Sequence, residues 1–157
     1  MGDLSEHLDS SEFACPCCGK NSIAELLPVW LEHLRLALGG HAMYISRGGG
    51  VRCKDYNEQI RSCGHVDDGA DRPHGSFHGR ACPKCGRQGM QRSAIRSRHM
   101  DGTEADIRVA DVSPDEVAAM AEALGFRNVG WYDTFTHVGI GGKPGRTARW
   151  DMRSNRG

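Results

Sequence analysis

The stretch that decides the fold of this chain is SRHMDGTEADIRV, residues 97–109. Its second half predicts a strand over Thr103–Val109 that leads out of a polar turn. His99 and Asp106 lie on either side of Gly102, a residue without a Cβ that can turn the chain sharply. The stretch therefore predicts a turn followed by a strand, with an imidazole and a carboxylate facing one point.

A second histidine, His137, lies downstream in Phe135–Gly139, which is also predicted to be a strand. Two imidazoles and one carboxylate are typical ligands of a catalytic zinc, whose fourth position is left to water. From a neighbouring strand, His137 can point to the same place as His99 and Asp106. The same ligand set also suits iron. The alternative without a metal is that His99 and Asp106 form an ordinary surface pair and that His137 is a hydrogen-bonded histidine of the core.

The whole chain, residues 1–157, is expected to form a single α+β domain, with a small antiparallel sheet and helices on one side. Asn21 or Ser22 can cap an amphipathic helix that ends at Gly39-Gly40. A second helix is predicted to start at Ser113-Pro114-Asp115-Glu116, which has the composition of a capping box. Gly48-Gly49-Gly50 is expected to be flexible. Further strands are predicted at Ala42–Ser46, Asn128–Asp133 and Thr147–Met152.

Residues 62–92 are expected to be a Cys/His-rich insertion, because they contain many glycines and no apolar periodicity. A structureless loop of this length is unusual in a compact domain, and a bound metal would give it a fixed shape. Cys82-Pro83-Lys84-Cys85-Gly86 is a typical zinc-knuckle sequence. Local closure favours one structural zinc site within the insertion. Its predicted ligands are Cys63, His65, Cys82 and Cys85, with His74 and His78 as further candidates.

A similar sequence, Cys15-Pro16-Cys17-Cys18-Gly19, lies near the start of the chain. Two such knuckles can bind one zinc together, which is an alternative to the site within the insertion. These cysteines and Cys53 can also be small buried side chains, or can form a disulfide after release from the cell. The odd total of seven cysteines argues against a fully paired disulfide framework.

Residues 97–106 resemble the signature Ser-x-His-x-x-Gly-x-Ala-x-Asp of a zinc peptidase family. This family contains the D-alanyl-D-alanine carboxypeptidases and L-alanyl-D-glutamate endopeptidases, which are hedgehog-like peptidoglycan metallopeptidases. Glu104 replaces the usual alanine. Further matches follow in order from Ser11 to Asp151, outside the insertion. They include Ser11–Cys15, Val51–Cys53 with Asn57, Gly125-Phe126, Tyr132 and Trp150.

The resemblance implies that His99, Asp106 and His137 are the ligands of one catalytic zinc. It also implies that Arg52 and Ser97 bind substrate. The planar fork of Arg52 suits a peptide carboxylate or a polarised carbonyl, and a plain surface arginine is the alternative.

The general base is where the chain departs from the family pattern. Relatives often carry an acid three residues before the last histidine and an aspartate two residues after it. This chain has Thr134 and Gly139 at these positions. Asp133 is favoured as the base by the resemblance, whereas Glu104 shares the face of Asp106 on a regular strand. The alternative is a zinc-binding relative without activity.

The resemblance implies a zinc metallopeptidase that hydrolyses the stem peptides of bacterial peptidoglycan with one catalytic zinc, and the Cys/His residues of the insertion add one candidate structural zinc. A formal net charge of zero and the absence of a long apolar run argue against a nucleic-acid partner and a membrane span, and a monomer is expected. No signal peptide is visible, so the chain is expected to be made in the cytoplasm and to act after release or within a phage particle. The alternative is a zinc-ribbon binding protein or phage structural protein without peptidase activity, whose basic residues 79–100 would contact nucleic acid.

Overall fold

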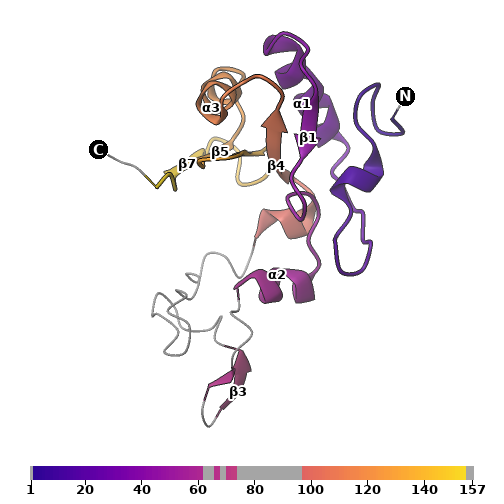
Figure 1. Cartoon of the computed structure of the whole chain (residues 1–157), viewed down its shortest axis with the longest axis vertical. Coiled ribbons are helices and arrows are strands. Elements are labelled where there is room, and N and C mark those ends of the chain that lie inside the picture. The colour runs from indigo at the N-terminus through magenta and orange to yellow at the C-terminus, as the bar shows by residue number, and fades with distance from the viewer. Residues whose placement is uncertain (1, 62–65, 68–69, 74–96, 155–157) are drawn as a thin grey trace.

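The computed structural model describes residues 2–61, 66–67, 70–73 and 97–154 (Figure 1). The main sheet has the strand order β1-β4-β6-β5-β7. Its strands are β1 (Met43–Ile45), β4 (Glu104–Val109), β5 (Asn128–Trp131), β6 (Thr136–Gly139) and β7 (Ala148–Asp151). In the part of the chain that the structure describes, the helices are α1 (Leu26–Ala37), α2 (Lys54–Arg61) and α3 (Pro114–Ala123), with the short 3-10 helices η1 (Ser10–Phe13) and η4 (Arg98–Asp101). The predicted α+β class is confirmed.

The main sheet is mixed rather than purely antiparallel. The pairs β1–β4, β4–β6 and β5–β6 are antiparallel, as expected. β7 lies beyond β5 and pairs parallel with it, from Asn128 opposite Ala148 to Trp131 opposite Asp151. β6 ends at Gly139, opposite Asn128 at the start of β5, and β7 begins at Ala148, opposite the same residue. The chain therefore crosses the start of β5 and then runs in the same direction as β5.

The two faces of the sheet differ chemically, because side chains alternate along each strand. One face is apolar and packs against α3, which contacts β4, β5 and β6 and is itself contacted by α1. Ala105, Ile107, Val129 and Val138 belong to this buried core. The helices contribute Leu27, Leu31, Leu34, Val117, Ala118 and Ala121. The other face carries the polar side chains of β4 and β6, and these form the candidate site.

α1 begins at Leu26, several residues later than the sequence suggests. The backbone N–H of Ala24 donates to the carbonyl of Gly102 (3.0 Å), which holds the preceding residues against η4 instead of in a helix. A Cβ on Gly102 would lie 1.9 Å from the carbonyl oxygen of Ser22, so this approach requires glycine. The expected cap is wrong, because Glu25 occupies the N-cap position and makes no side-chain capping bond.

The run Gly48-Gly49-Gly50 is packed, and the expectation that it is flexible is wrong. Gly49 accepts a hydrogen bond from the backbone N–H of Asp106 (2.8 Å) and is buried. A Cβ on Gly49 would lie 2.6 Å from the Cβ of Asp106, and one on Gly50 would lie 2.5 Å from Phe13. These glycines are needed because two backbone segments approach the loop closely.

Within the expected insertion, the structure describes an antiparallel hairpin formed by β2 (Val66–Asp67) and β3 (Ala70–Pro73). Cys63, His65, His74, His78, Cys82 and Cys85 lie outside the described residues, so the structural zinc site in the insertion stays a prediction. Among the helices that the structure describes, none is long and apolar enough to cross a membrane.

Candidate metal centre

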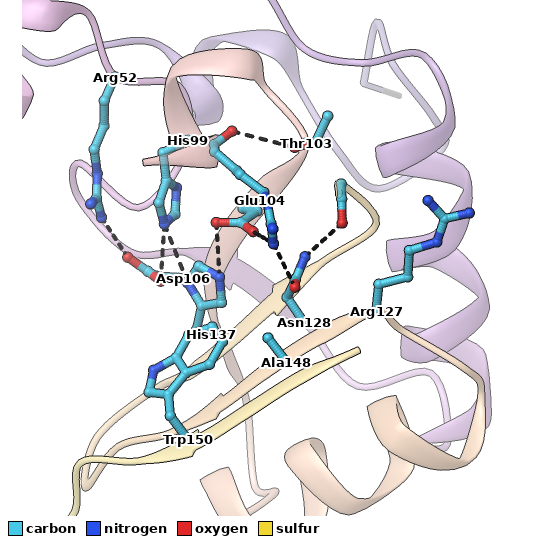
Figure 2. A network of polar contacts seen from close by, with 12 residues as sticks. Arg52, His99, Thr103, Glu104, Asp106, Arg127, Asn128, His137, Ala148 and Trp150 are labelled. Atoms are coloured by element: carbon cyan, nitrogen blue, oxygen red, sulfur yellow. Dashed lines mark hydrogen bonds and ion pairs between the residues drawn. The ribbon is translucent and has the colours of Figure 1, made fainter. Parts of the chain in front are cut away.

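Three buried side chains converge beside the polar face of the sheet (Figure 2). His99 comes from η4, whereas Asp106 and His137 are direct cross-strand partners on β4 and β6. Nε2 of His99 lies 3.3 Å from Nδ1 of His137 and 3.5 Å from Oδ1 of Asp106. Nδ1 of His137 lies 2.8 Å from the same Oδ1. The structure thus brings together the three predicted ligands.

This donor set fits a zinc ion. A tetrahedral site with bonds of about 2.0–2.2 Å separates neighbouring donor atoms by roughly 3.3–3.6 Å. The two separations that involve His99, 3.3 and 3.5 Å, are in this range. The third is shorter because His137 and Asp106 share a hydrogen bond. Three protein donors leave one coordination position for water, which is the arrangement of a catalytic rather than a structural site.

Two of the donors are oriented by the loop Gly48-Gly49-Gly50 and by Arg52, two residues after it. Nδ1 of His99 donates to the carbonyl of Gly50 (2.9 Å), which leaves Nε2 as the lone-pair nitrogen facing Asp106. Nη2 of Arg52 donates to Oδ2 of Asp106 (2.7 Å), while its Nε donates to the carbonyl of Gly48 (2.7 Å). The closely packed loop therefore positions both the imidazole and the carboxylate.

His137 lies between a carboxylate and an indole ring. Its Nε2 lies 3.1 Å from Oε2 of Glu104, at an ion-pair distance although not in a well-aligned hydrogen bond. The ring of Trp150 packs 4.8 Å from the imidazole, centroid to centroid. Gly130 makes room for it, because a Cβ there would lie 2.4 Å from the indole. These contacts fix the imidazole with Nδ1 toward Asp106.

The buried charges shift each other's titration. Burial tends to raise the pKa of Asp106, but the contacts with His137 and His99 outweigh it and hold that pKa well below its usual range. Burial likewise opposes ionisation of Glu104, and its contact with His137 lowers its pKa. Burial would lower the pKa of His137, but Asp106 and Glu104 raise it to about 9. A metal at Nδ1 must therefore displace a proton from this imidazole.

The two candidate bases have different surroundings. Glu104 is buried on the polar face of β4, against His137. Asp133 is exposed, and its carboxylate accepts hydrogen bonds from the backbone N–H of Ser154 (3.1 and 3.2 Å) and from the Ser154 hydroxyl. These bonds lower the pKa of Asp133 and connect it to the C-terminal segment. The structure therefore brings Glu104, and not Asp133, into contact with the converging ligands.

The two candidate substrate-binding residues flank His99 in different ways. Arg52 lies at the site through its bond to Asp106, and its backbone N–H donates to the carbonyl of His99 (3.1 Å). Ser97 is the N-cap residue of η4, and its side chain makes no capping hydrogen bond. Its carbonyl accepts from the N–H of Met100 (3.0 Å), which sets the turn that carries His99.

The sequence analysis gave three residues that support the metal site, Arg98, Asn128 and Trp150, no role at that site. Nη1 of Arg98 donates to Oδ1 of Asn128 (2.7 Å) and lies 3.6 Å from Oε1 of Glu104. Arg98 therefore offsets the negative charge of Glu104 at the carboxylate oxygen that does not face His137. Trp150 covers His137 from β7. Strand alternation could have indicated that Asn128 lies beside the site, because it is paired with Gly139, the residue opposite Glu104.

Comparison with known proteins bears on this geometry. Residues 81–140 match the family model described as Peptidase M15. The matched segment is less than half of the chain, yet it contains His99, Asp106 and His137, whereas Arg52 precedes it. No curated protein matches the chain. The segment that supplies the three converging side chains thus has the sequence pattern of Peptidase M15, the zinc peptidase family that the metal motif resembles.

Proposed function

We propose that this protein is a zinc metallopeptidase that hydrolyses the peptide stems of bacterial peptidoglycan. The observation that carries the proposal is the convergence of His99, Asp106 and His137, each oriented by a further polar contact. Such outer contacts are typical of functional metal sites, where they fix the tautomer and orientation of the ligands. The match to Peptidase M15 supports the peptidase class.

A zinc ion held by these residues would polarise the scissile carbonyl and make a bound water nucleophilic near neutral pH. The protein's own groups prepare the site for this role. Because the carbonyl of Gly50 accepts from Nδ1 of His99, that imidazole keeps its proton away from the metal. In His137 the remaining proton belongs on Nε2, where Oε2 of Glu104 lies 3.1 Å away.

We propose Glu104 as the acidic residue that serves this site, in preference to Asp133. Glu104 is buried against a ligand and carries a lowered pKa, so it is ionised at neutral pH. Its contact lies on the side of the His137 ring opposite Nδ1, which makes it a positioning residue for the ligand. Asp133 remains a candidate base only through its resemblance to the family pattern, because its hydrogen bonds run to Ser154.

Arg52 and Ser97 are the proposed contacts to substrate. Arg52 presents a guanidinium beside the ligand Asp106, where a stem-peptide carboxylate or the scissile carbonyl would lie close to the metal. Ser97 precedes His99 by two residues, and its hydroxyl is not used to cap η4. Both residues are oriented through the turn that carries His99.

We further propose that the protein acts as a monomer on cell-wall peptides, after release from the cell or as part of a phage particle. The family resemblance supports this setting. The apolar core lies between the sheet and its helices, and the metal ligands come from one chain.

Digestion of purified peptidoglycan tests the proposed function. The zinc-loaded protein is expected to release soluble peptides or D-alanine at neutral pH, and mass spectrometry of the products separates endopeptidase from carboxypeptidase cleavage. His99→Ala should abolish release, whereas His33→Ala, which changes an exposed histidine on α1, should leave it unchanged. Failure of the zinc-loaded wild type to release any product would overturn the proposal and favour an inactive relative.

A further inference from the structure

A second group of metal-binding side chains lies apart from the His99 site. The sulfurs of Cys15, Cys17, Cys18 and Cys53 all lie within 4.8 Å of one another. We propose that these four cysteines bind a structural zinc ion as thiolates, and that this ion fixes the segment that carries Arg52. The proposal concerns a separate ion and does not depend on the peptidase activity.

The geometry of the four sulfurs fits zinc better than it fits a disulfide. With Zn–S bonds of about 2.3 Å, a tetrahedral site separates its sulfurs by roughly 3.8 Å. Sγ of Cys17 lies 3.7 Å from Sγ of Cys15 and 3.1 Å from Sγ of Cys53. A disulfide requires about 2.05 Å, and all four thiols are free. Four thiols gathered this closely are the usual ligands of a structural zinc.

The backbone around the sulfurs has the form of a zinc knuckle. The N–H of Gly19 donates to the carbonyl of Cys15 (2.9 Å), and Gly19 has a left-handed φ of 69°, which closes a tight turn. The backbone N–H of Cys53 points at Sγ of Cys15 (3.4 Å), and that of Tyr56 points at Sγ of Cys53 (3.3 Å). Such N–H···S contacts favour thiolate over thiol, which a metal ligand requires.

The second ligand segment explains what the ion would do. Cys53 immediately follows Arg52, whose guanidinium bonds to Asp106. Val51, the residue before Arg52, donates from its backbone N–H to the carbonyl of Phe13 (2.7 Å). A zinc at the four cysteines would therefore clamp the N-terminal segment to the loop that positions Arg52. It would join two segments whose closest ligands, Cys18 and Cys53, have 34 residues between them in the sequence.

The proposed site also accounts for the number of cysteines. Four of the seven cysteines belong to this cluster. The remaining three are Cys63, Cys82 and Cys85, which together with His65 form the set predicted for the insertion. The two sets share no residue, so the chain contains enough ligands for both structural sites beside the catalytic one.

Cobalt substitution tests this proposal in the full chain. Cobalt bound to thiolates gives an intense sulfur-to-metal charge-transfer band in the near ultraviolet, whereas the His99 site has no sulfur ligand and does not contribute. The background for the test is the variant with Cys63→Ser, Cys82→Ser and Cys85→Ser, which removes the thiols of the insertion. This background is expected to keep the band, with one sulfur-bound cobalt per chain in addition to any cobalt at the His99 site. Adding His99→Ala should leave the band, and adding Cys53→Ser should abolish or strongly weaken it.

Absence of the band in the folded background, or a band that Cys53→Ser leaves unchanged, would overturn the proposal. Thiol alkylation of the reduced wild type decides the case in which Cys53→Ser does not fold. The four cysteines are expected to be protected in zinc and to be labelled after a chelator is added. Equal labelling with and without zinc would contradict the proposal, as would a disulfide among these cysteines that persists in reduced, zinc-loaded protein.

Discussion

Glu104 and Gly139 are direct cross-strand partners on β4 and β6, and the side chain of Glu104 occupies the space that a Cβ at position 139 would fill. Such a Cβ would lie 2.6 Å from Cγ of Glu104 and 3.1 Å from Nδ2 of Asn128. The family pattern that the chain resembles has alanine at the first position and often aspartate at the second. In this chain the carboxylate beside His137 therefore comes from Glu104 on β4, whereas the family pattern often has an aspartate on the partner strand, at the position of Gly139.

This relationship predicts that Gly139→Ala destabilises the protein by about 1–3 kcal/mol, because the added methyl group forces Glu104 from its place. Unfolding by urea measures the change. In the Glu104→Ala background the same substitution should cost at least about 1 kcal/mol less, since the obstructing side chain is gone. Equal costs in both backgrounds would show that the two residues do not interact. The exchanged pair Glu104→Ala with Gly139→Asp is expected to retain zinc at the His99 site.

Glu104→Gln is expected to weaken zinc binding at the His99 site by about 10–100-fold, because the charge that orients His137 is lost while the shape remains. Competition with a chromophoric chelator measures the affinity for zinc at the His99 site. The zinc at this site is identified as the one that is absent from His99→Ala. Glu25→Gln, at an exposed position that makes no capping bond, is the matched control and should leave the affinity unchanged. An unchanged affinity in Glu104→Gln would remove its positioning role.

Arg52→Ala is expected to destabilise the metal-free protein by about 3 kcal/mol, because it leaves the largely buried carboxylate of Asp106 without its guanidinium partner. With zinc bound, the loss should be smaller, since the ion supplies positive charge to the same carboxylate. Arg52→Lys should recover only part of the stability, because an ammonium lacks the planar fork that bonds to both Asp106 and Gly48. Denaturant midpoints in chelator and in zinc measure these differences. The same loss in both conditions would contradict a metal beside Asp106.

The stability of the metal-free protein is expected to depend on His137 in a defined pH window. The pKa of His137 is raised to about 9 in the folded protein, from about 6.5 in the unfolded chain. Its stabilisation is therefore fully present below about pH 6.5 and is lost as the pH rises through about 9. The difference in melting temperature between wild type and His137→Gln, measured in chelator, should shrink across this window. A difference that stays constant with pH would show that His137 is not paired with Asp106 and Glu104.

The parts of the fold that local signals determine were predictable from the sequence. α3 begins with a complete capping box at Ser113 and Glu116, as its sequence indicates. β4 and β6 lie where the motif residues predicted strands, and the shared face of Glu104 and Asp106 follows from a period of two. These features depend on neighbours within a few residues, which is why the sequence alone indicates them.

The parts that depend on distant partners were not predictable. α2 has the sequence KDYNEQIR, in which only Tyr56 and Ile60 are apolar, so its helical signal is short and weak. The direction of β7 depends on how the chain passes β5, which its residues do not record. The packing of Gly48-Gly49-Gly50 depends on Asp106 and Phe13, which are far away in sequence.

The same limit applies to the two candidate sites. The three candidate zinc ligands could be proposed from residue type and motif, but the contacts of His99 with Gly50 and of Asp106 with Arg52 join segments about fifty positions apart. Local closure favoured a metal site within the insertion, and this reasoning did not find the proximity of Cys53 to Cys15, which the fold creates. Proximity in space, and not spacing in sequence, identifies that cluster.

Metal stoichiometry of the wild type and of His99→Ala tests the central claim most directly. The claim is that His99, Asp106 and His137 hold the catalytic zinc. Elemental analysis of the two purified proteins should show that His99→Ala has lost one zinc per chain while the sulfur-bound metal remains. His33→Ala, at an exposed position, should have the same metal content as the wild type. An unchanged zinc content in His99→Ala would remove His99 from the ligand set and contradict the account of the site.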